Sequence, residues 1–144
     1  MPDIENSILI DGEMEEVYEV AKDMENYPQF MENIVEVKVV ERGENTTITS
    51  WIAEVDDKRL TWKEKDIFDP ENKHISYKLI EGDLKKFSGE WQFEEKNMGT
   101  KLRLTVNFEF GVPMLSAVVN PILKKKVISN SKAMLKAIKE EVEA

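Results

Sequence analysis

Hydrophobic and polar residues alternate most regularly over residues 81–113, and this pattern predicts two long strands joined by a tight turn. In the first strand, one face carries Phe87, Gly89, Trp91 and Phe93, and the other face is polar. The second strand has an apolar face of its own, which carries Leu102, Leu104, Val106, Phe108 and Phe110. A sheet with one aromatic face needs a cover, and the long amphipathic stretch that follows is the element that can supply it.

The remaining elements follow from the same kind of periodicity. Residues 3–10 alternate weakly and predict a first strand, residues 13–24 have apolar positions at helical spacing, and residues 27–31 predict a second short helical turn that Pro28 starts. Turn residues separate the strands that come next, which are predicted at residues 34–42, 46–55, 60–68 and 74–81. The last helix is expected from near Pro113 almost to the C-terminus, with Pro121 kinking or dividing it early.

This order of elements predicts an α+β fold built on one antiparallel sheet, because closely spaced strands with short turns form meanders. The chain has 144 residues, which is long enough for one domain with a core of its own. A curved sheet that holds a single helix commonly leaves a cavity between the two. The function then depends on what that cavity holds.

The amino-acid composition argues against several classes of function. The chain has no Cys, which excludes disulfides, thiolate metal sites and a Cys nucleophile, and its net charge of -9 argues against nucleic acid as a main partner. The basic cluster at 124–126 is expected to be solvated surface. No apolar run is long enough to span a membrane, and no signal-peptide pattern is seen, so we expect a cytoplasmic protein without stable membrane insertion. No phosphate loop or cation-loop spacing is present, so no cofactor and no metal is expected.

Short motifs spread along the chain carry a family resemblance. They are Asn6-Ser7-Ile8, Tyr27-Pro28, Trp62, Glu81-Gly82-Asp83-Leu84, Gly89-x-Trp91-x-Phe93, Gly99-Thr100 and Phe108-Glu109-Phe110-Gly111-x-Pro113. In these residues and in its order of elements, the chain resembles the START-like superfamily, whose fold is called a helix-grip, and within it the polyketide cyclase/dehydrase and lipid-transport branch.

The resemblance implies a curved antiparallel sheet of about seven strands wrapped around a long C-terminal helix, with two short helices between strands 1 and 2. Residues 1–144 are then expected to form a single START-like domain, present as a monomer or a homodimer. Aromatase/cyclase members are thought to orient a polyketide with a Ser, Arg and Tyr set. Aligned on Trp62, those positions fall on Glu64, Asp66 and, for the Tyr, near Ile34. Two carboxylates cannot form a cationic clamp for enolate or carbonyl oxygens, so that mechanism is not expected here.

The strand predicted at residues 60–68 carries the candidate catalytic residues, Glu64 and Asp66. If Trp62 faces inward, both carboxyl groups do so as well. Burial and mutual repulsion would then raise their pKa values, so that one could serve as a general acid or base. Two alternatives stay open: a register that turns Thr61 and Ile67 inward, and a structural role in which Glu64 bonds Tyr77 or a cationic side chain on a neighbouring strand.

Large apolar side chains form the candidate ligand-binding set, although core packing is the common fate of such residues. The set comprises Tyr27, Phe30, Trp51, Trp62, Tyr77, Trp91, Phe93, Met114 and Met134. His74, the only histidine, has no local Ser or Cys partner and is expected to be exposed at a sheet edge.

Together these patterns favour a protein that binds, and by extension transports, a hydrophobic small molecule such as a lipid, isoprenoid, quinone or polyketide. The first alternative is a small cyclase- or dehydratase-type enzyme in which Glu64 or Asp66 is the general acid or base. The second is a protein-interaction module.

Overall fold

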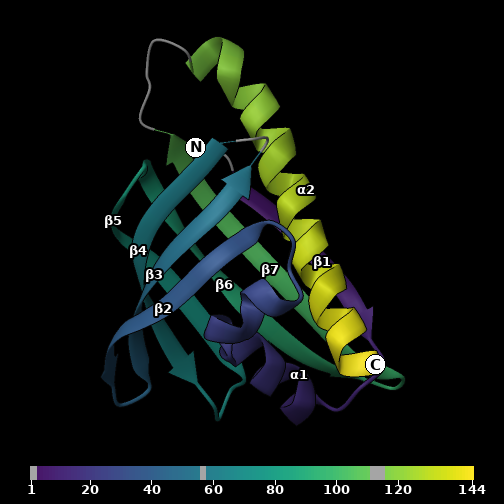
Figure 1. The fold of residues 1–144 in the computed structure, drawn as a ribbon. Coiled ribbons are helices and arrows are strands. Elements are labelled where there is room, and N and C mark those ends of the chain that lie inside the picture. Colours follow the sequence, from purple (N-terminus) through teal and green to yellow (C-terminus); the bar gives the residue numbers. More distant parts are fainter. Residues whose placement is uncertain (1–2, 56–57, 111–115) are drawn as a thin grey trace.

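The computed structural model describes residues 3–55, 58–110 and 116–144. Over these ranges seven strands and three helices follow one another in the predicted order (Figure 1). The elements are β1 (Asp3–Ile10), α1 (Met14–Lys22), the 3-10 helix η1 (Met24–Gln29), β2 (Ile34–Gly43), β3 (Thr46–Val55), β4 (Lys58–Asp69), β5 (His74–Gly82), β6 (Leu84–Lys96), β7 (Gly99–Phe110) and α2 (Ser116–Glu143).

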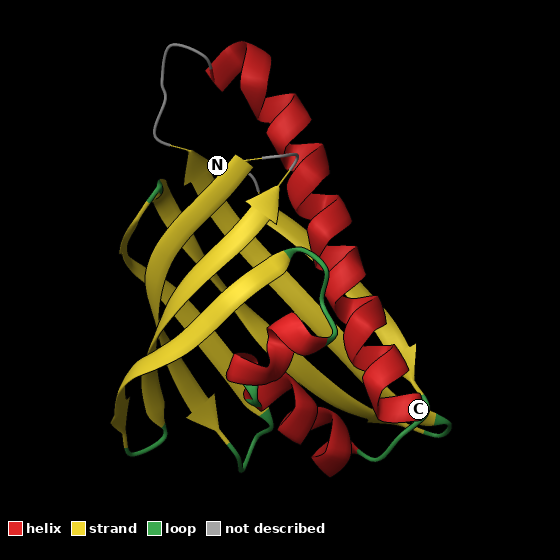
Figure 2. Cartoon of the chain, in the orientation of Figure 1, coloured by secondary structure: helices red, strands yellow, loops and turns green. Residues whose placement is uncertain are grey.

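All seven strands belong to one antiparallel sheet with the order β1-β7-β6-β5-β4-β3-β2. The sheet curves, α2 packs against β1, β7 and α1, and the two short helices lie at one end of the sheet (Figure 2). This arrangement confirms the helix-grip fold that the sequence predicts. None of the described helices is long and apolar enough to cross a membrane.

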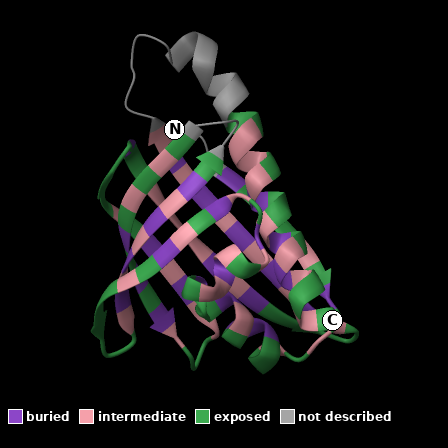
Figure 3. Ribbon diagram, viewed as in Figure 1, coloured by how far each residue is buried: buried purple, intermediate pink, exposed green. Residues whose placement is uncertain are grey.

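Alternation in the sequence becomes alternation in burial along the strands (Figure 3). On β6 and β7 the apolar residues of one face are opposite each other, as in the pairs Trp91–Leu104 and Phe93–Leu102, and all four of these side chains are buried. Cross-strand pairs of this kind stabilise a sheet and pin its register, because a slip of one residue would expose the whole apolar face.

Two details of the helices differ from the prediction. The second short helix is a 3-10 helix that begins at Met24, with Pro28 inside it. The helix α2 runs unbroken from Ser116 to Glu143, so the prediction that Pro121 divides it is wrong. A proline near a helix start removes one backbone hydrogen bond, and the remaining turns keep theirs. The predicted helix start at Pro113 lies outside the described residues.

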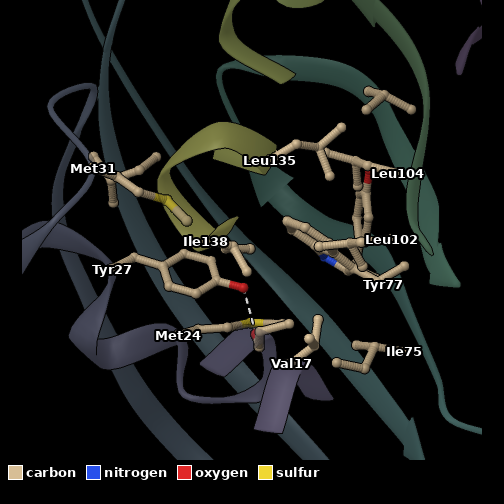
Figure 4. Packing of buried hydrophobic residues seen from close by; sticks show 14 of the residues in the cluster. Val17, Met24, Tyr27, Met31, Ile75, Tyr77, Leu102, Leu104, Leu135 and Ile138 are labelled. Carbon is tan, nitrogen blue, oxygen red and sulfur yellow. Dashed lines mark hydrogen bonds between the residues drawn. The ribbon is translucent and has the colours of Figure 1, made fainter. Parts of the chain in front are cut away.

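The hydrophobic core is densest where α1, η1 and the C-terminal half of α2 meet the sheet (Figure 4). Val17, Tyr27, Leu102, Leu135 and Ile138 are all buried there. The Tyr27 hydroxyl donates a hydrogen bond to the Ala21 carbonyl oxygen, which satisfies its one polar group inside the core. Side chains therefore fill this end of the grip.

Candidate functional site

A cavity of about 120 Å³ lies between the inner face of the sheet and the middle of α2. Residues of β2 to β7 form its wall, and Val127, Asn130, Ser131 and Met134 of α2 close it. The wall is overwhelmingly apolar. Its aromatic members are Trp51, Trp62, Tyr77, Phe87, Trp91 and Phe108, and they include all three tryptophans of the chain.

The aromatic wall is an ordered set of rings. Trp51 and Trp62 are opposite each other on β3 and β4, and their rings stack with centroids 5.6 Å apart and an interplanar angle of 8°. The ring of Phe87 meets Trp62 edge-on, with ring centroids 5.4 Å apart, and its centroid lies 5.2 Å from that of Tyr77. Stacked and edge-to-face pairs are preferred geometries for aromatic side chains, so the rings hold one another in place.

Tyr77 reaches across a neighbouring strand. It is paired with Gly89 on β6, and its hydroxyl donates a hydrogen bond of 2.8 Å to the carbonyl oxygen of Thr105 on β7. A Cβ atom added at Gly89 would collide with both that hydroxyl and that carbonyl oxygen. Gly89 therefore provides the space in which the Tyr77 ring lies.

The strand β4 turns both candidate carboxyl groups inward. Glu64 is 3 % exposed and Asp66 is 0 % exposed, whereas Thr61 and Ile67 face outward and Ile67 is 46 % exposed. The alternative register with Thr61 and Ile67 inward is therefore wrong. Apolar cover favours this orientation, because the inward face also carries Trp62.

Glu64 lines the cavity, and its Oε1 accepts a hydrogen bond of 2.8 Å from Nε1 of Trp62. The Tyr77 hydroxyl bonds Thr105, so the predicted bond between Glu64 and Tyr77 does not form. A β-bulge lies beside this residue, because Lys63 pairs with Glu81 while Glu64 pairs with Leu79. Bulges re-aim side chains and are over-represented beside active sites.

Asp66 is not part of the cavity wall and lies in a polar pocket of β3. Its Oδ2 accepts hydrogen bonds from the hydroxyls of Thr47 (3.1 Å) and Thr49 (2.7 Å). Thr49 in turn accepts a bond of 2.7 Å from Nε1 of Trp51. A chain of hydrogen bonds thus connects the aromatic wall to the Asp66 carboxylate.

The two carboxyl groups influence each other's pKa. Burial raises the pKa of Glu64 well above its ordinary value, the neighbouring Asp66 raises it further, and the bond from Trp62 opposes the rise. Burial also raises the pKa of Asp66, against the lowering effect of Glu64 and of the Thr49 and Thr47 hydroxyls. The buried Asp66 Oδ1 has no hydrogen-bond partner among the described residues. Because Asp66 accepts bonds from two hydroxyl groups, it is the better placed of the two to be ionised.

The predicted ligand-binding residues divide into two groups. Trp51, Trp62, Tyr77, Trp91 and Met134 come together around the cavity.

Tyr27, Phe30 and Phe93 do not line the cavity. The ring of Tyr27 packs against Trp51 with ring centroids 5.7 Å apart. The ring of Phe93 packs against Tyr18 of α1 with centroids 5.1 Å apart. These rings pack with the short helices and belong to the core. Met114 lies outside the described residues.

Sequence reasoning missed the polar residues of the cavity. Asn33, which lies between η1 and β2, donates a hydrogen bond of 2.9 Å from Nδ2 to Oδ1 of Asn130 on α2, and Ser131 lies next to it. The two asparagines are 97 positions apart, and neither has a local motif. The helical spacing of 127, 130, 131 and 134 is the one signal that could have placed Asn130 and Ser131 on the cavity side.

His74 lies far from this chemistry. It begins β5, a central strand rather than an edge strand, so the predicted edge position is wrong. Its Nε2 is 3.4 Å from Oε2 of Glu90. No group of three or more His, Asp or Glu side chains that could hold a metal ion occurs in the described ranges.

Comparison with known proteins gives a family and two kinds of relative. A family described as "Polyketide cyclase / dehydrase and lipid transport" matches residues 10–135. The actinorhodin polyketide synthase bifunctional cyclase/dehydratase of Streptomyces coelicolor is 29 % identical over 94 residues, which are 64 % of this chain and 30 % of that protein. This chain therefore spans less than a third of that relative. The ribosome association toxin RatA of Escherichia coli K12 is 22 % identical over 143 residues, covering 97 % of this chain and 89 % of that protein.

Solved structures agree with the fold. A protein from Thermus thermophilus superimposes with a TM-score of 0.94 at 28 % identity, covering 98 % of this chain and 97 % of that one. The Zhui aromatase/cyclase of Streptomyces sp. R1128 gives a TM-score of 0.91 at 23 % identity, over 99 % of this chain and 93 % of that one. The family match covers most of the sequence, and this chain belongs to the polyketide cyclase/dehydrase and lipid-transport family.

Proposed function

We propose that this protein binds a hydrophobic small molecule, such as a lipid, isoprenoid, quinone or polyketide, in the cavity between the sheet and α2. The observation that carries this proposal is the cavity wall itself, which is mostly apolar and rich in aromatic rings, with a few polar groups from Glu64, Asn33, Asn130 and Ser131. Ligand pockets have this character, with mostly apolar walls and a few placed polar groups. Membership of a family that includes lipid transport supports the same reading.

The size of the cavity indicates how much of a ligand it encloses. Its volume of about 120 Å³ is below the ~300–1,000 Å³ of typical ligand sites and near the ~150 Å³ of a cavity that admits benzene. A single ring or a comparable apolar segment fits without rearrangement. The cavity is not sealed, and Met134 on its α2 side has an adaptable side chain, so a longer ligand can extend from it.

Occupancy can be measured through the tryptophans, since all three line the cavity. We expect toluene and larger apolar compounds to change tryptophan fluorescence saturably and to raise the melting temperature. Ala53→Leu, which adds volume inside the cavity, should weaken binding strongly. Glu54→Leu, on the exposed face of the same strand, should leave binding unchanged. Absence of binding by every apolar compound, or equal binding by Ala53→Leu, would contradict the proposal.

A second candidate function is a dehydratase or cyclase reaction, and the position of Glu64 is the observation that favours it. A carboxyl group whose pKa is raised by burial, at the wall of an apolar cavity, can act as a general acid. It would give its proton to a departing hydroxyl group, which leaves as water. The carboxylate so formed would take the proton from the adjacent carbon as the double bond forms.

The enzyme hypothesis is tested with a β-hydroxy ketone of polyketide type as substrate. Glu64→Gln should abolish dehydration while leaving binding within a few-fold of the wild type, because the amide has the size of the acid but no transferable proton. Full turnover by Glu64→Gln would rule out this role for Glu64.

A further inference from the structure

Resting on the proposed function, we propose that the cavity selects neutral rings that carry a hydroxyl group, which donates its proton in a hydrogen bond to Glu64, and that it rejects carboxylates. The ligand class is therefore a phenol or a cyclic alcohol, rather than a fatty acid or another organic anion. The arrangement of the polar groups around Glu64 carries this inference.

Glu64 offers hydrogen-bond acceptor sites to a ligand. Its Oε1 already accepts from Trp62 at 2.8 Å. A carboxyl group has about four lone-pair sites, and the Trp62 bond uses one of them. Because Glu64 lines the cavity, the remaining sites can accept a hydrogen bond from a ligand hydroxyl. A ligand hydroxyl satisfies that acceptor, whereas an ether or a hydrocarbon leaves it without a partner.

The donors beside Glu64 already bond the protein. The indole N–H of Trp62 bonds Glu64, the indole N–H of Trp51 bonds Thr49, and the Tyr77 hydroxyl bonds the Thr105 carbonyl oxygen. A ligand atom beside Glu64 that only accepts hydrogen bonds therefore gains nothing from these three groups.

Charge distinguishes the ligand classes as well. Asp66 accepts hydrogen bonds from the Thr47 and Thr49 hydroxyls, which favours a negative charge on that carboxyl group. The described residues that line the cavity include no Lys, Arg or His. A carboxylate ligand would be desolvated without a counter-charge and repelled by this negative charge, and both effects are large in a poorly solvated site.

The experiment compares four single-ring probes of similar shape: p-cresol, p-methylanisole, toluene and p-toluate. Titration calorimetry of the full chain at neutral pH gives the four dissociation constants. We expect p-cresol to bind roughly 3- to 10-fold more tightly than p-methylanisole, the usual effect of one net hydrogen bond. We expect p-toluate to bind at least about 10-fold more weakly than toluene, as one uncompensated buried charge requires.

Variants assign each preference to its residue. Glu64→Leu should bind p-cresol no better than p-methylanisole. Glu64→Gln keeps an oxygen for Trp62 and offers an N–H to Asp66, so it should keep the hydroxyl preference and the rejection of p-toluate even where Glu64→Leu folds poorly. Asp66→Asn removes the charge while keeping the hydroxyl preference, and should bind p-toluate several-fold more tightly than the wild type.

The outcomes separate this inference from the proposed function. If toluene, p-methylanisole and p-cresol bind equally well, the inference is overturned and binding of an apolar ligand stands. The inference is also overturned if Glu64→Gln alone abolishes the rejection of p-toluate, since the charge would then lie on Glu64. If no probe binds, the inference and the proposed function both fail.

Discussion

At the scale of single residues, the main question is how two neighbouring carboxyl groups, Glu64 and Asp66, can both be buried. Two buried carboxyl groups on one strand would repel each other if both were ionised. Donors from Trp62, Thr47 and Thr49 offset part of this cost, and burial favours the protonated form of Glu64 because it raises the pKa of that group. Of the two carboxyl groups, Glu64 lines the cavity and Asp66 does not.

The raised pKa of Glu64 makes the free energy of unfolding depend on pH. Because burial raises the pKa of Glu64 above its ordinary 4.5, the folded protein keeps a proton that the unfolded chain loses as the pH rises past 4.5. The contribution of Glu64 to stability is therefore fully present below this pH and is lost as the pH rises toward the folded-state pKa. Glu64→Gln has no proton to lose, so it should gain stability relative to the wild type by at most about 1.4 kcal/mol per pH unit in this window.

Urea unfolding of both proteins at a series of pH values from 4 upward, roughly one unit apart, measures this difference. Subtracting the wild-type curve of unfolding free energy against pH from that of Glu64→Gln removes the contribution of the other carboxyl groups. Glu95→Gln, at an exposed position on β6, serves as the control and should not reproduce the gain. A difference that stays constant with pH would show that Glu64 is ionised in the folded protein.

At the scale of elements, β6 determines how the sheet supports its cavity. Gly89 lets the Tyr77 ring cross from β5 to a carbonyl oxygen on β7, so three strands are connected through one side chain. Here the lack of a Cβ matters more than backbone freedom. The aromatic wall depends on this single small residue.

Gly89→Ala should destabilise the protein by roughly 1–3 kcal/mol, as overpacking does in other cores. The added methyl group meets the Thr105 carbonyl oxygen and the Tyr77 hydroxyl. Tyr77→Phe in the same chain should rescue part of this loss, since it removes the collision with the hydroxyl and leaves those with the Thr105 carbonyl oxygen and with Cζ of the ring. Chemical denaturation gives the values.

The control for this substitution is Gly43→Ala. Its new Cβ would meet the end of the Thr46 side chain at 2.6 Å, and that side chain can rotate away. The loss of stability should therefore be clearly smaller. Equal losses at both positions would show that Gly89 has no special place in the wall.

The helix α2 belongs to the core at one end and to the cavity at the other. Ile138, which is 0 % exposed, lies among the core residues of α1 and η1 (Figure 4). Ile138→Ala should cost about 2–5 kcal/mol, because it leaves a void in a tightly packed region. Lys136→Ala, at an exposed position on the same helix, should change stability by less than about 0.5 kcal/mol. Thermal and urea unfolding would measure both, and similar values would mean that α2 is not anchored through Ile138.

At the scale of the whole molecule, the grip is filled at one end and hollow at the other. The short helices and the C-terminal half of α2 pack the first end, and the aromatic wall surrounds the cavity at the second. Trp51, Tyr77 and Trp91 nevertheless belong both to the hydrophobic core and to the cavity wall. The two regions thus share one face of the sheet.

Whole-molecule charge sets a limit on partners. With a net charge of -9, the protein should show no binding of single- or double-stranded RNA at physiological salt, because phosphate contacts need a basic surface. Electrophoretic mobility shift over a salt series tests this, with a basic RNA-binding protein as the positive control. Binding that weakens steeply with salt would contradict the expectation and would favour an interaction role.

Much of the fold follows from sequence alone, and some of the site does as well. Alternation along β4, β6 and β7 predicts which residues share a face, because side-chain direction in a strand has a period of two residues. This places Trp62, Glu64 and Asp66 together on one face. The family resemblance then supplies the curvature and the gripping helix, and the family match supports it.

What the sequence by itself determined is thus the order of the elements and the residues that share a face of each strand. Tertiary structure decided that the face of β4 with Glu64 and Asp66 turns inward. Tertiary structure alone decided which aromatic rings enclose the cavity and which fill the core, because Tyr27 and Phe93 pack with rings that come from elsewhere in the chain. It also decided the partners of the carboxyl pair and the bond between Asn33 and Asn130. The bond between Thr49 and Asp66 joins residues 17 positions apart, and the bond between Asn33 and Asn130 joins residues 97 positions apart. Local periodicity reports on direction within an element, and the distances between elements are set only when they pack.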